Sequence, residues 1–147
     1  MSDTPTLHAT AVLTGRTAIL IRGPSGSGKS RLALDLIQSG ALPFARLVGD
    51  DRVHVEAAHG RLLVRPAATL AGLIEVRGLG IRRLPYEPVA RIGLIVDLAA
   101  ADAARLPPAG AAETALSGIS LPRLPVAPGL APLPLILAWL GSVPSAN

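Results

Sequence analysis

The residues with the clearest chemical meaning form the segment Gly23-Pro24-Ser25-Gly26-Ser27-Gly28-Lys29-Ser30. This segment fits the phosphate-binding pattern G-x-x-x-x-G-K-[ST] at every position. Its glycines let the backbone curl so that successive N–H groups point at phosphate oxygens. Lys29, the only lysine in the chain, can reach the outer phosphates, and the Ser30 hydroxyl can hold Mg²⁺. We therefore expect a site for a nucleoside triphosphate or another polyphosphate.

A second group with chemical potential is the pair Asp50-Asp51. Phosphoryl transfer needs a carboxylate for Mg²⁺ and, when the acceptor is a hydroxyl, another carboxylate to take its proton. Two adjacent aspartates on a turn can divide these tasks. Alone, the pair would be interpreted as an ordinary turn. The phosphate-binding pattern upstream favours the chemical interpretation.

The elements around these residues have the order that the chemistry requires. The apolar run Thr17–Ile21 predicts a strand, and residues 31–38 predict a helix whose N-terminus adds positive potential at the phosphates. Leu7–Leu13 predicts a strand before this unit, and Arg46–Gly49 predicts a strand that runs into the aspartate pair. This strand–loop–helix context supports the phosphate-binding interpretation.

The remainder of the chain predicts mostly strands. Residues 74–81 alternate like one strand, but two glycines suggest a bend where the backbone approaches something closely. Residues 99–118, rich in Ala, Pro and Gly, predict no element. The other expected elements are a hairpin (53–57 and 61–65), a strand buried on both faces (89–98), an edge strand (121–126) and a closing helix (133–140). We expect an α/β fold with a mixed sheet and few helices.

Composition narrows the class of protein. A chain of 147 residues is most simply one domain (1–147), and its core must be aliphatic because aromatics are 2% of residues. Cysteine is absent, which excludes disulfides and thiolate metal sites. We expect a cytoplasmic protein without membrane contact, because there is no secretory segment and no apolar run of about 20 residues. The net charge of +4 comes from scattered arginines, so nucleic acid is not the expected partner.

The order of the motifs resembles the HPr kinase/phosphorylase family. The resembling parts are His8, the phosphate-binding segment, residues 47–53 and residues 74–81. The last part fits Glu-x-Arg-Gly-x-Gly-Ile, the family's signature segment, which is more specific than a phosphate-binding loop. Its defining residues here are Glu75, Arg77, Gly78 and Gly80. The resemblance spans about residues 8–126 and is to short, proteobacterial-type members that comprise only the C-terminal catalytic domain.

This resemblance implies a P-loop domain similar to the nucleotide-binding fold of phosphoenolpyruvate carboxykinase. It also implies a Mg²⁺-dependent enzyme that phosphorylates a serine of an HPr-like phosphocarrier with ATP or pyrophosphate. In reverse, inorganic phosphate removes the phosphoryl group and pyrophosphate is released. The expected role is regulation of a phosphotransferase system. A homo-oligomer is expected, because longer members form hexamers.

The resemblance also assigns roles near the aspartates. Asp50 is expected to take the serine proton, and Asp51 to support Mg²⁺ beside Ser30. His8 would lie near Asp50 and orient it; without the resemblance, His8 would be an exposed strand residue.

Three further residues receive roles by resemblance. Glu75 would help to hold the metal, and Arg77 would shape the phosphate or partner surface; the alternative is an ion pair between them at a strand bend. Arg105 would offset charge on the transferred phosphoryl group. Around Arg105, Ala and Pro replace an Asp and a Gly of the family pattern.

Two other function classes remain open on the sequence. One is a small-molecule P-loop kinase, although 147 residues leave little room for a lid and an acceptor pocket. The other is a non-catalytic module that senses nucleotides or binds nucleic acid. ATP turnover stimulated by a metabolite would favour the first, and steeply salt-dependent nucleic-acid binding the second.

Overall fold

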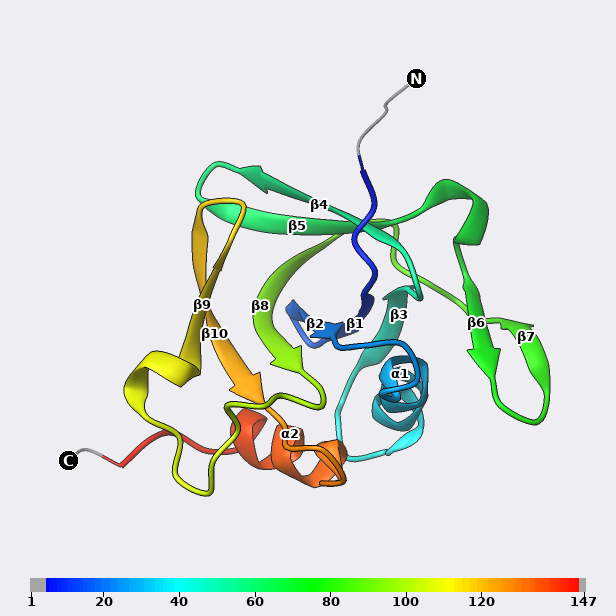
Figure 1. Cartoon of the computed structure of the whole chain (residues 1–147). Helices are drawn as coiled ribbons and strands as arrows, with labels where there is room; N and C mark the ends of the chain where they lie inside the picture. The colour runs from blue at the N-terminus through cyan, green and yellow to red at the C-terminus, as the bar shows by residue number, and fades with distance from the viewer. Residues whose placement is uncertain (1–4, 146–147) are drawn as a thin grey trace.

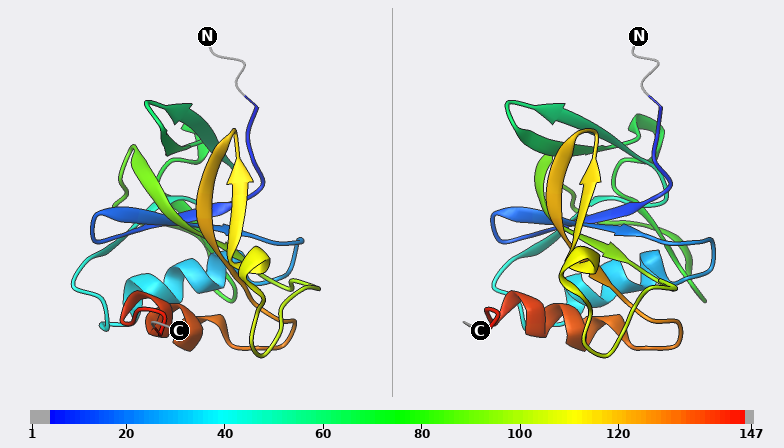
Figure 2. Two further views of the ribbon diagram at one scale, coloured as in Figure 1. Left: turned by 90° about the vertical axis from the view of Figure 1, so that its left-hand side faces the viewer. Right: turned by 60° about the vertical axis from the view of Figure 1, so that its left-hand side comes forward.

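The computed structural model describes residues 5–145, which form a mixed β-sheet with two α-helices on one face (Figures 1 and 2). The helices are α1 (Lys29–Gln38) and α2 (Pro132–Leu140). The strands are β1 (Thr10–Thr14), β2 (Thr17–Arg22), β3 (Ala45–Gly49), β4 (Val53–Ala58), β5 (Arg61–Pro66), β6 (Leu73–Val76), β7 (Gly80–Arg83), β8 (Ala90–Asp97), β9 (Glu113–Leu116) and β10 (Ile119–Pro125). Short 3₁₀ turns lie at Ala68–Leu70 and Ala109–Ala112. The expected α/β class is confirmed. In the part of the chain that the structure describes, neither helix could cross a membrane.

The central sheet has the strand order β3-β1-β2-β8-β10-β9. Strands β2, β8 and β10 run parallel, whereas β1 and β3 pair antiparallel to their neighbours. The β4–β5 hairpin joins the sheet through antiparallel pairing of β5 with β8. The carboxyl ends of the three parallel strands therefore meet at one edge, where ligands commonly bind in α/β sheets.

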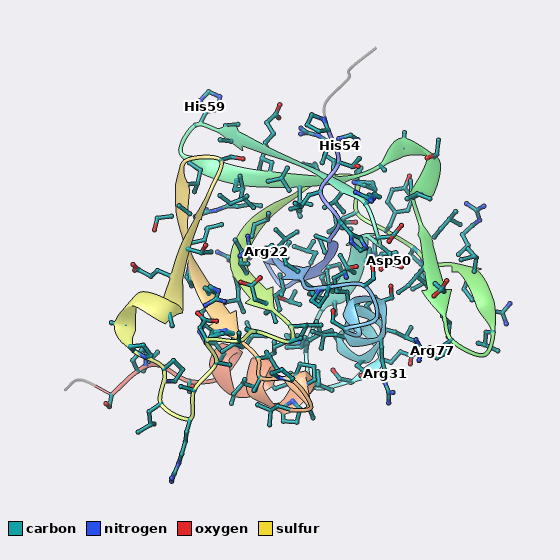
Figure 3. The ribbon with its side chains drawn as sticks, in the orientation of Figure 1. Arg22, Arg31, Asp50, His54, His59 and Arg77 are labelled. Carbon is teal, nitrogen blue, oxygen red and sulfur yellow. The ribbon has the colours of Figure 1, made fainter. Side chains whose placement is uncertain are left out.

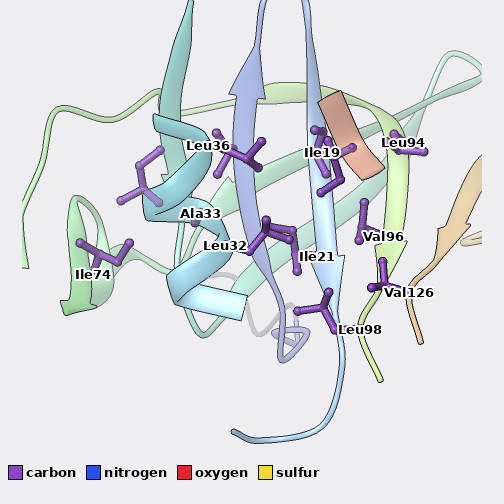
Figure 4. Close-up of a cluster of buried hydrophobic side chains, with 13 residues drawn as sticks. Ile19, Ile21, Leu32, Ala33, Leu36, Ile74, Leu94, Val96, Leu98 and Val126 are labelled. Carbon is purple, nitrogen blue, oxygen red and sulfur yellow. The ribbon is translucent and has the colours of Figure 1, made fainter. Parts of the chain in front are cut away.

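Two apolar clusters, one on each face of the sheet, explain why β2 and β8 are continuously apolar. Ile19 and Ile21 of β2 pack with Leu32 and Leu36 of α1 on the helix-covered face (Figure 4). On the other face, Leu20 packs in a cluster that includes Leu62 and Val64 of the β4–β5 hairpin. Alternate residues of each strand thus enter opposite cores. This double burial fixes the strand register next to the glycine-rich loop.

Residues 74–81 do not form the single bent strand predicted above. They belong to a hairpin of β6 and β7 that forms a separate two-stranded sheet beside α1 (Figure 1). Gly78 and Gly80 adopt φ of 93° and 95°, and no atom lies within 4 Å of a Cβ built on either. The glycines are therefore needed for a turn and not for close approach of another group.

The predicted edge strand and the uninterpreted segment also differ from expectation. β10 lies inside the sheet because β9, formed by residues 113–116, pairs with it. Pro122 precedes the residues of β10 that pair with β8, and Pro125 is the last residue of the strand. Because residues 99–118 are rich in Ala and Pro, their sequence pattern did not predict the short strand β9.

Candidate functional site

The glycine-rich loop, Gly23–Ser30, connects the carboxyl end of β2 to the start of α1. Gly26 and Gly28 have φ of 80° and 99°, values that favour glycine, so the backbone curls as the motif requires. A Cβ on Gly23 would lie 2.6 Å from Ser27 Oγ and would also crowd Leu98. The loop can therefore adopt this path only with glycine at its first position.

The Lys29 ammonium lies inside the curl of the loop. Its Nζ donates to the carbonyl oxygens of Gly23 at 2.8 Å and Pro24 at 3.1 Å. Burial lowers the pKa of Lys29, and the negative charges of Asp51 and Asp50 oppose this effect. The ammonium has neutral backbone partners and nearby carboxylates, so it can turn toward an anion without breaking an ion pair.

The start of α1 fits a phosphate-bearing ligand. The helix is capped by Gly28 without a side-chain hydrogen bond, and its first turn holds no acidic residue. Its terminal N–H groups and positive potential are therefore free of the usual side-chain partners. Space is open above the loop, because no atom lies within 4 Å of a Cβ built on Gly26 or Gly28. This donor set is the kind that binds phosphate oxygens.

Asp50, at the end of β3, is buried and receives three hydrogen bonds. Ser30 Oγ donates to Oδ1 at 2.6 Å, Thr10 Oγ1 donates to Oδ1 at 2.8 Å, and the Glu75 N–H donates to Oδ2 at 3.3 Å. The carboxylate thus joins α1, β1 and β6 at one point. Its pairing with the Ser30 hydroxyl supplies the oxygen ligands that Mg²⁺ prefers.

Asp51 faces the other way and lies beside His8. Asp51 Oδ1 is 3.2 Å from His8 Nε2, and its side chain is 63% exposed. Asp51 has a left-handed backbone, φ 71°, and the Arg52 N–H donates to the Asp50 carbonyl across it at 2.8 Å. This tight turn sends the two carboxylates in different directions.

The contacts of the two aspartates therefore differ from those expected, while their roles stay a prediction. The sequence interpretation put His8 beside Asp50 and Ser30 beside Asp51, whereas the structure pairs Ser30 with Asp50 and His8 with Asp51. The physical reason is the left-handed turn at Asp51, which rotates this side chain out toward solvent. Asp50 directly follows β3, and its buried side chain accepts a hydrogen bond from Ser30 of the glycine-rich loop.

A cleft of about 760 Å³ brings most of the predicted residues together. Its lining includes residues of the loop, of the segment before β1, of α1 and of the β6–β7 hairpin. Figure 3 labels two of them, Arg31 of α1 and Arg77 of the hairpin turn. The lining residues are His8, Thr10, Ser25, Gly26, Ser27, Gly28, Lys29, Ser30, Arg31, Leu34, Asp35, Asp51, Glu75, Val76 and Arg77. The cleft unites the glycine-rich loop, the Asp51–His8 pair and Ser30, whose hydroxyl donates to the buried Asp50.

Glu75 and Arg77 line this cleft but form no ion pair with each other in residues 5–145. The alternative of a structural Glu75–Arg77 pair is therefore wrong. Within the same residues, no group of three or more His, Cys, Asp or Glu side chains could hold a metal by itself. A Mg²⁺ ion here would share its coordination among Ser30, one or two carboxylates, phosphate oxygens and water, as is usual for this ion.

Arg105 is not where the resemblance would put it. It is exposed in the segment between β8 and β9 and is not part of the cleft lining. By contrast, Arg123 of β10 has carboxylate partners. It donates to Asp97 through Nε and to Asp102 through both terminal nitrogens at 2.8 and 3.0 Å. The role expected for Arg105 at the transferred phosphoryl group therefore stays a prediction.

Two components of the region were missed by sequence reasoning. Thr10, the first residue of β1, lies two residues after His8, and its hydroxyl contacts both aspartates: Oδ1 of Asp50 and the N–H of Asp51, at 3.4 Å. Strand alternation from His8 could have identified it. The other is the pairing of Arg22, next to the loop, with Asp97 at 2.7 and 2.9 Å. These residues are 75 positions apart, and no local pattern connects them.

Asp97 is neutralised by arginines on both sides. Arg22 and Arg123 both donate to it, and this offsets the burial that would otherwise raise its pKa, so the pKa of Asp97 lies below its ordinary value. The Leu98 N–H also donates to the Arg22 carbonyl at 2.8 Å. This Arg22–Asp97–Arg123 network anchors β8 and β10 to the strand end from which the glycine-rich loop departs.

Comparisons with known proteins agree with this geometry. A family model described as HPr Serine kinase C-terminal domain matches residues 1–106. An HPr kinase/phosphorylase of Clostridium beijerinckii is 45% identical over 75 residues, which cover 51% of this chain and 24% of the relative. An HPr kinase/phosphorylase of Halalkalibacterium halodurans is 37% identical over 106 residues, which cover 67% of this chain and 33% of the relative. The chain thus spans a quarter to a third of the length of these curated relatives.

A solved structure extends the similarity to most of the described fold. The structure of the Hpr(Ser) kinase/phosphatase from Coxiella burnetii matches with a TM-score of 0.72 and 25% identity, covering 90% of each chain. The family match covers well over half of this chain and includes the loop, both aspartates and the Glu75–Gly80 segment. The chain belongs to the HPr serine kinase C-terminal domain family.

Proposed function

We propose that this chain is a Mg²⁺-dependent protein-serine kinase/phosphorylase that acts on an HPr-like phosphocarrier protein, with ATP or pyrophosphate as phosphoryl donor. One observation carries the proposal. The glycine-rich loop with Lys29 lines the same cleft as the exposed Asp51–His8 pair. The Ser30 hydroxyl of this loop donates to the buried Asp50. Regulation of a phosphotransferase system, a cytoplasmic location and assembly into a homo-oligomer belong to the same proposal.

The loop and Lys29 bind and orient the phosphoryl donor. The N–H groups at the start of α1 face the phosphates, and the ammonium of Lys29 offsets charge on the transferred group. Ser30 and Asp50 would hold Mg²⁺, which supplies charge neutralisation between donor and transferred phosphoryl group. Thr10 and the Glu75 N–H keep the Asp50 carboxylate in position for that task.

Asp51 is the base in this proposal, in place of Asp50. Its carboxylate lines the open cleft, and its Oδ1 contacts His8 Nε2. The serine hydroxyl gives its proton to Asp51, its oxygen bonds to the terminal phosphorus, and the bridging oxygen–phosphorus bond of the donor breaks. In the reverse direction, a phosphate oxygen attacks the phosphoserine phosphorus, Asp51 returns the proton to the serine oxygen, and pyrophosphate leaves.

The test is phosphoryl transfer to carrier proteins. The chain is incubated with Mg-ATP and the HPr proteins of Clostridium beijerinckii, Coxiella burnetii and its own host, and phosphoserine is located by mass spectrometry. Inorganic phosphate is then added and pyrophosphate is measured. We expect phosphoserine in the first step and its loss with pyrophosphate in the second. Absence of phosphoserine on every carrier contradicts the proposal, and ATP turnover stimulated only by small metabolites would favour a small-molecule kinase.

A further inference from the structure

The β6–β7 hairpin, Leu73–Arg83, carries an exposed surface that the proposed chemistry does not use. Only one side of it is buried: Ile74 packs into the core with α1, whereas every residue of β7 is exposed. The hairpin lies beside α1 and outside the central sheet (Figures 1 and 2). Its base is closed by the Leu84 N–H, which donates to the Gly72 carbonyl at 2.8 Å. It is therefore an anchored projection with a free outer strand.

Two large aliphatic side chains on this projection face solvent. Leu79 is 65% exposed at the turn, and Ile81 is 62% exposed on β7. The turn is fixed by the Leu79 N–H, which donates to the Val76 carbonyl at 2.9 Å, and by the positive φ of the flanking glycines. The fold thus holds these aliphatic groups in water at defined positions, which is typical of a contact surface.

The surface continues into the cleft. Ile81 is the cross-strand partner of Glu75, and directly opposed residues share a face of a two-stranded sheet. Glu75 lines the cleft that also holds Asp51. A protein whose serine reaches Asp51 would therefore place the surroundings of that serine against Ile81 and the turn.

Charge defines the kind of partner. Four exposed arginines lie on or next to the hairpin: Arg31, Arg77, Arg82 and Arg83. None of them forms an ion pair with another residue of the described chain. Arg31 comes from α1 and Arg77 from the hairpin turn, and both line the cleft (Figure 3). Unpaired guanidinium groups of this density attract carboxylates and repel basic surfaces.

We infer that the β6–β7 hairpin is the docking arm for the acceptor protein, and that it selects a serine-bearing surface with exposed carboxylates beside aliphatic side chains. This inference rests on the proposed protein-serine kinase function. Leu79 and Ile81 supply apolar contact, Arg83 pairs with the partner's carboxylates from the face of Ile81, and Arg82 adds positive charge from the opposite face of β7. The cleft then binds the serine, while the hairpin contacts the partner surface around that serine.

The test uses two double variants of the arm, Leu79→Ser/Ile81→Ser and Arg82→Glu/Arg83→Glu. These four residues lie outside the cleft lining, so the KM for Mg-ATP should not change. We expect the KM for the carrier protein to rise about tenfold or more, as for loss of a central contact, with kcat at saturating carrier within about threefold. The matched control is Arg16→Glu/Arg61→Glu, which makes the same charge change at two exposed positions outside the cleft lining, the β1–β2 turn and the start of β5.

Direct binding separates this inference from the proposed function. Calorimetry with the three HPr proteins measures docking without catalysis, and vesicles containing phosphatidylglycerol test an anionic lipid surface instead. Arm-dependent carrier binding without phosphoserine would support the arm and contradict the kinase. Transfer with an unchanged carrier KM in both variants overturns the arm and leaves the kinase. No carrier binding at all, or arm-dependent binding to vesicles alone, also overturns it.

Discussion

Two charged clusters flank the end of β2, and they differ in how completely the protein neutralises them. On one side, Asp97 is held between Arg22 and Arg123. On the other side, Lys29 bonds to neutral carbonyls, and Asp51 lines the cleft with its Oδ1 3.2 Å from His8 Nε2. A buried charge that has its full set of partners stabilises structure, and a charge left open can act on a ligand. The geometry thus separates a fully paired cluster from an open one within one strand end.

The substitution Asp51→Asn is the strongest test of the difference between the two clusters. If Asp51 is the base, the substitution should lower the rate of phosphoserine formation by about 10²–10⁴-fold, the range for general base catalysis. The free energy of unfolding should change little, because the side chain is mostly exposed. The assay is the initial rate at saturating Mg-ATP and carrier protein. Asp102→Asn, an exposed carboxylate of the opposite cluster, is the matched control. Equal losses in both variants would contradict the separation.

Lys29→Ala should produce the next largest effect. Loss of the ammonium should lower kcat by about 10²–10³-fold, because it removes one pre-positioned donor for charge on the transferred group. Binding of Mg-ATP should weaken as well, which fluorescence of a labelled nucleotide can measure. Arg22→Met removes a positive charge from the other cluster and serves for comparison. A Lys29→Ala variant that retained full transfer would remove the loop from the mechanism.

Thr10→Val sharpens the comparison inside the cleft. Thr10 is fully buried, and its hydroxyl donates to Asp50 and accepts from the Asp51 N–H. Valine keeps the shape and removes both contacts, so we expect kcat to fall about tenfold, the equivalent of one net hydrogen bond. The Mg²⁺ concentration for half-maximal rate should rise, because Asp50 loses a positioning partner. Thr10→Ser should restore both values, whereas a purely structural role would show only in the melting temperature.

Sequence patterns predicted the cleft better than they predicted roles within it. The loop motif, the aspartate pair and residues 74–80 all depend on local composition, and the structure brings them around one cleft. Which aspartate faces the cleft depends on one dihedral angle at Asp51, and residue types alone did not show it. A left-handed Asp is permitted but not required in such a turn. The prediction therefore gave each aspartate the neighbour that the structure gives to the other.

Long-range pairing explains the other misses. The Arg22–Asp97–Arg123 network joins residues on three strands, and only the tertiary fold makes them neighbours. β9 is short and Ala-rich, and it exists because β10 offers it a partner. By contrast, Gly78 and Gly80 carried a usable local signal that was interpreted as a bend. Two glycines two residues apart in an alternating run fit a hairpin turn equally well.

Asp97→Asn should have the smallest effect on transfer and the largest on stability. Phosphoserine formation should stay within about threefold of the unmodified chain, because Asp97 lies outside the cleft lining. The free energy of unfolding should fall by about 3 kcal/mol, near the low end for breaking a buried pair, since both arginines lose a charged partner. Urea unfolding at pH 7 measures this difference. A large loss of transfer with unchanged stability would place Asp97 with the catalytic residues.

The pH dependence of that difference gives an independent check. The pKa of Asp97 in the folded chain is lowered, because Arg22 and Arg123 donate to it. A lowered folded pKa contributes stability above the unfolded value, about 3.9, and loses it as pH falls through the folded value. The gap in unfolding free energy between the unmodified chain and Asp97→Asn should therefore be constant near neutral pH and shrink below about pH 4. A gap that stayed at its neutral-pH size as the pH fell below that value would mean that shape, and not charge, stabilises this side of the strand end.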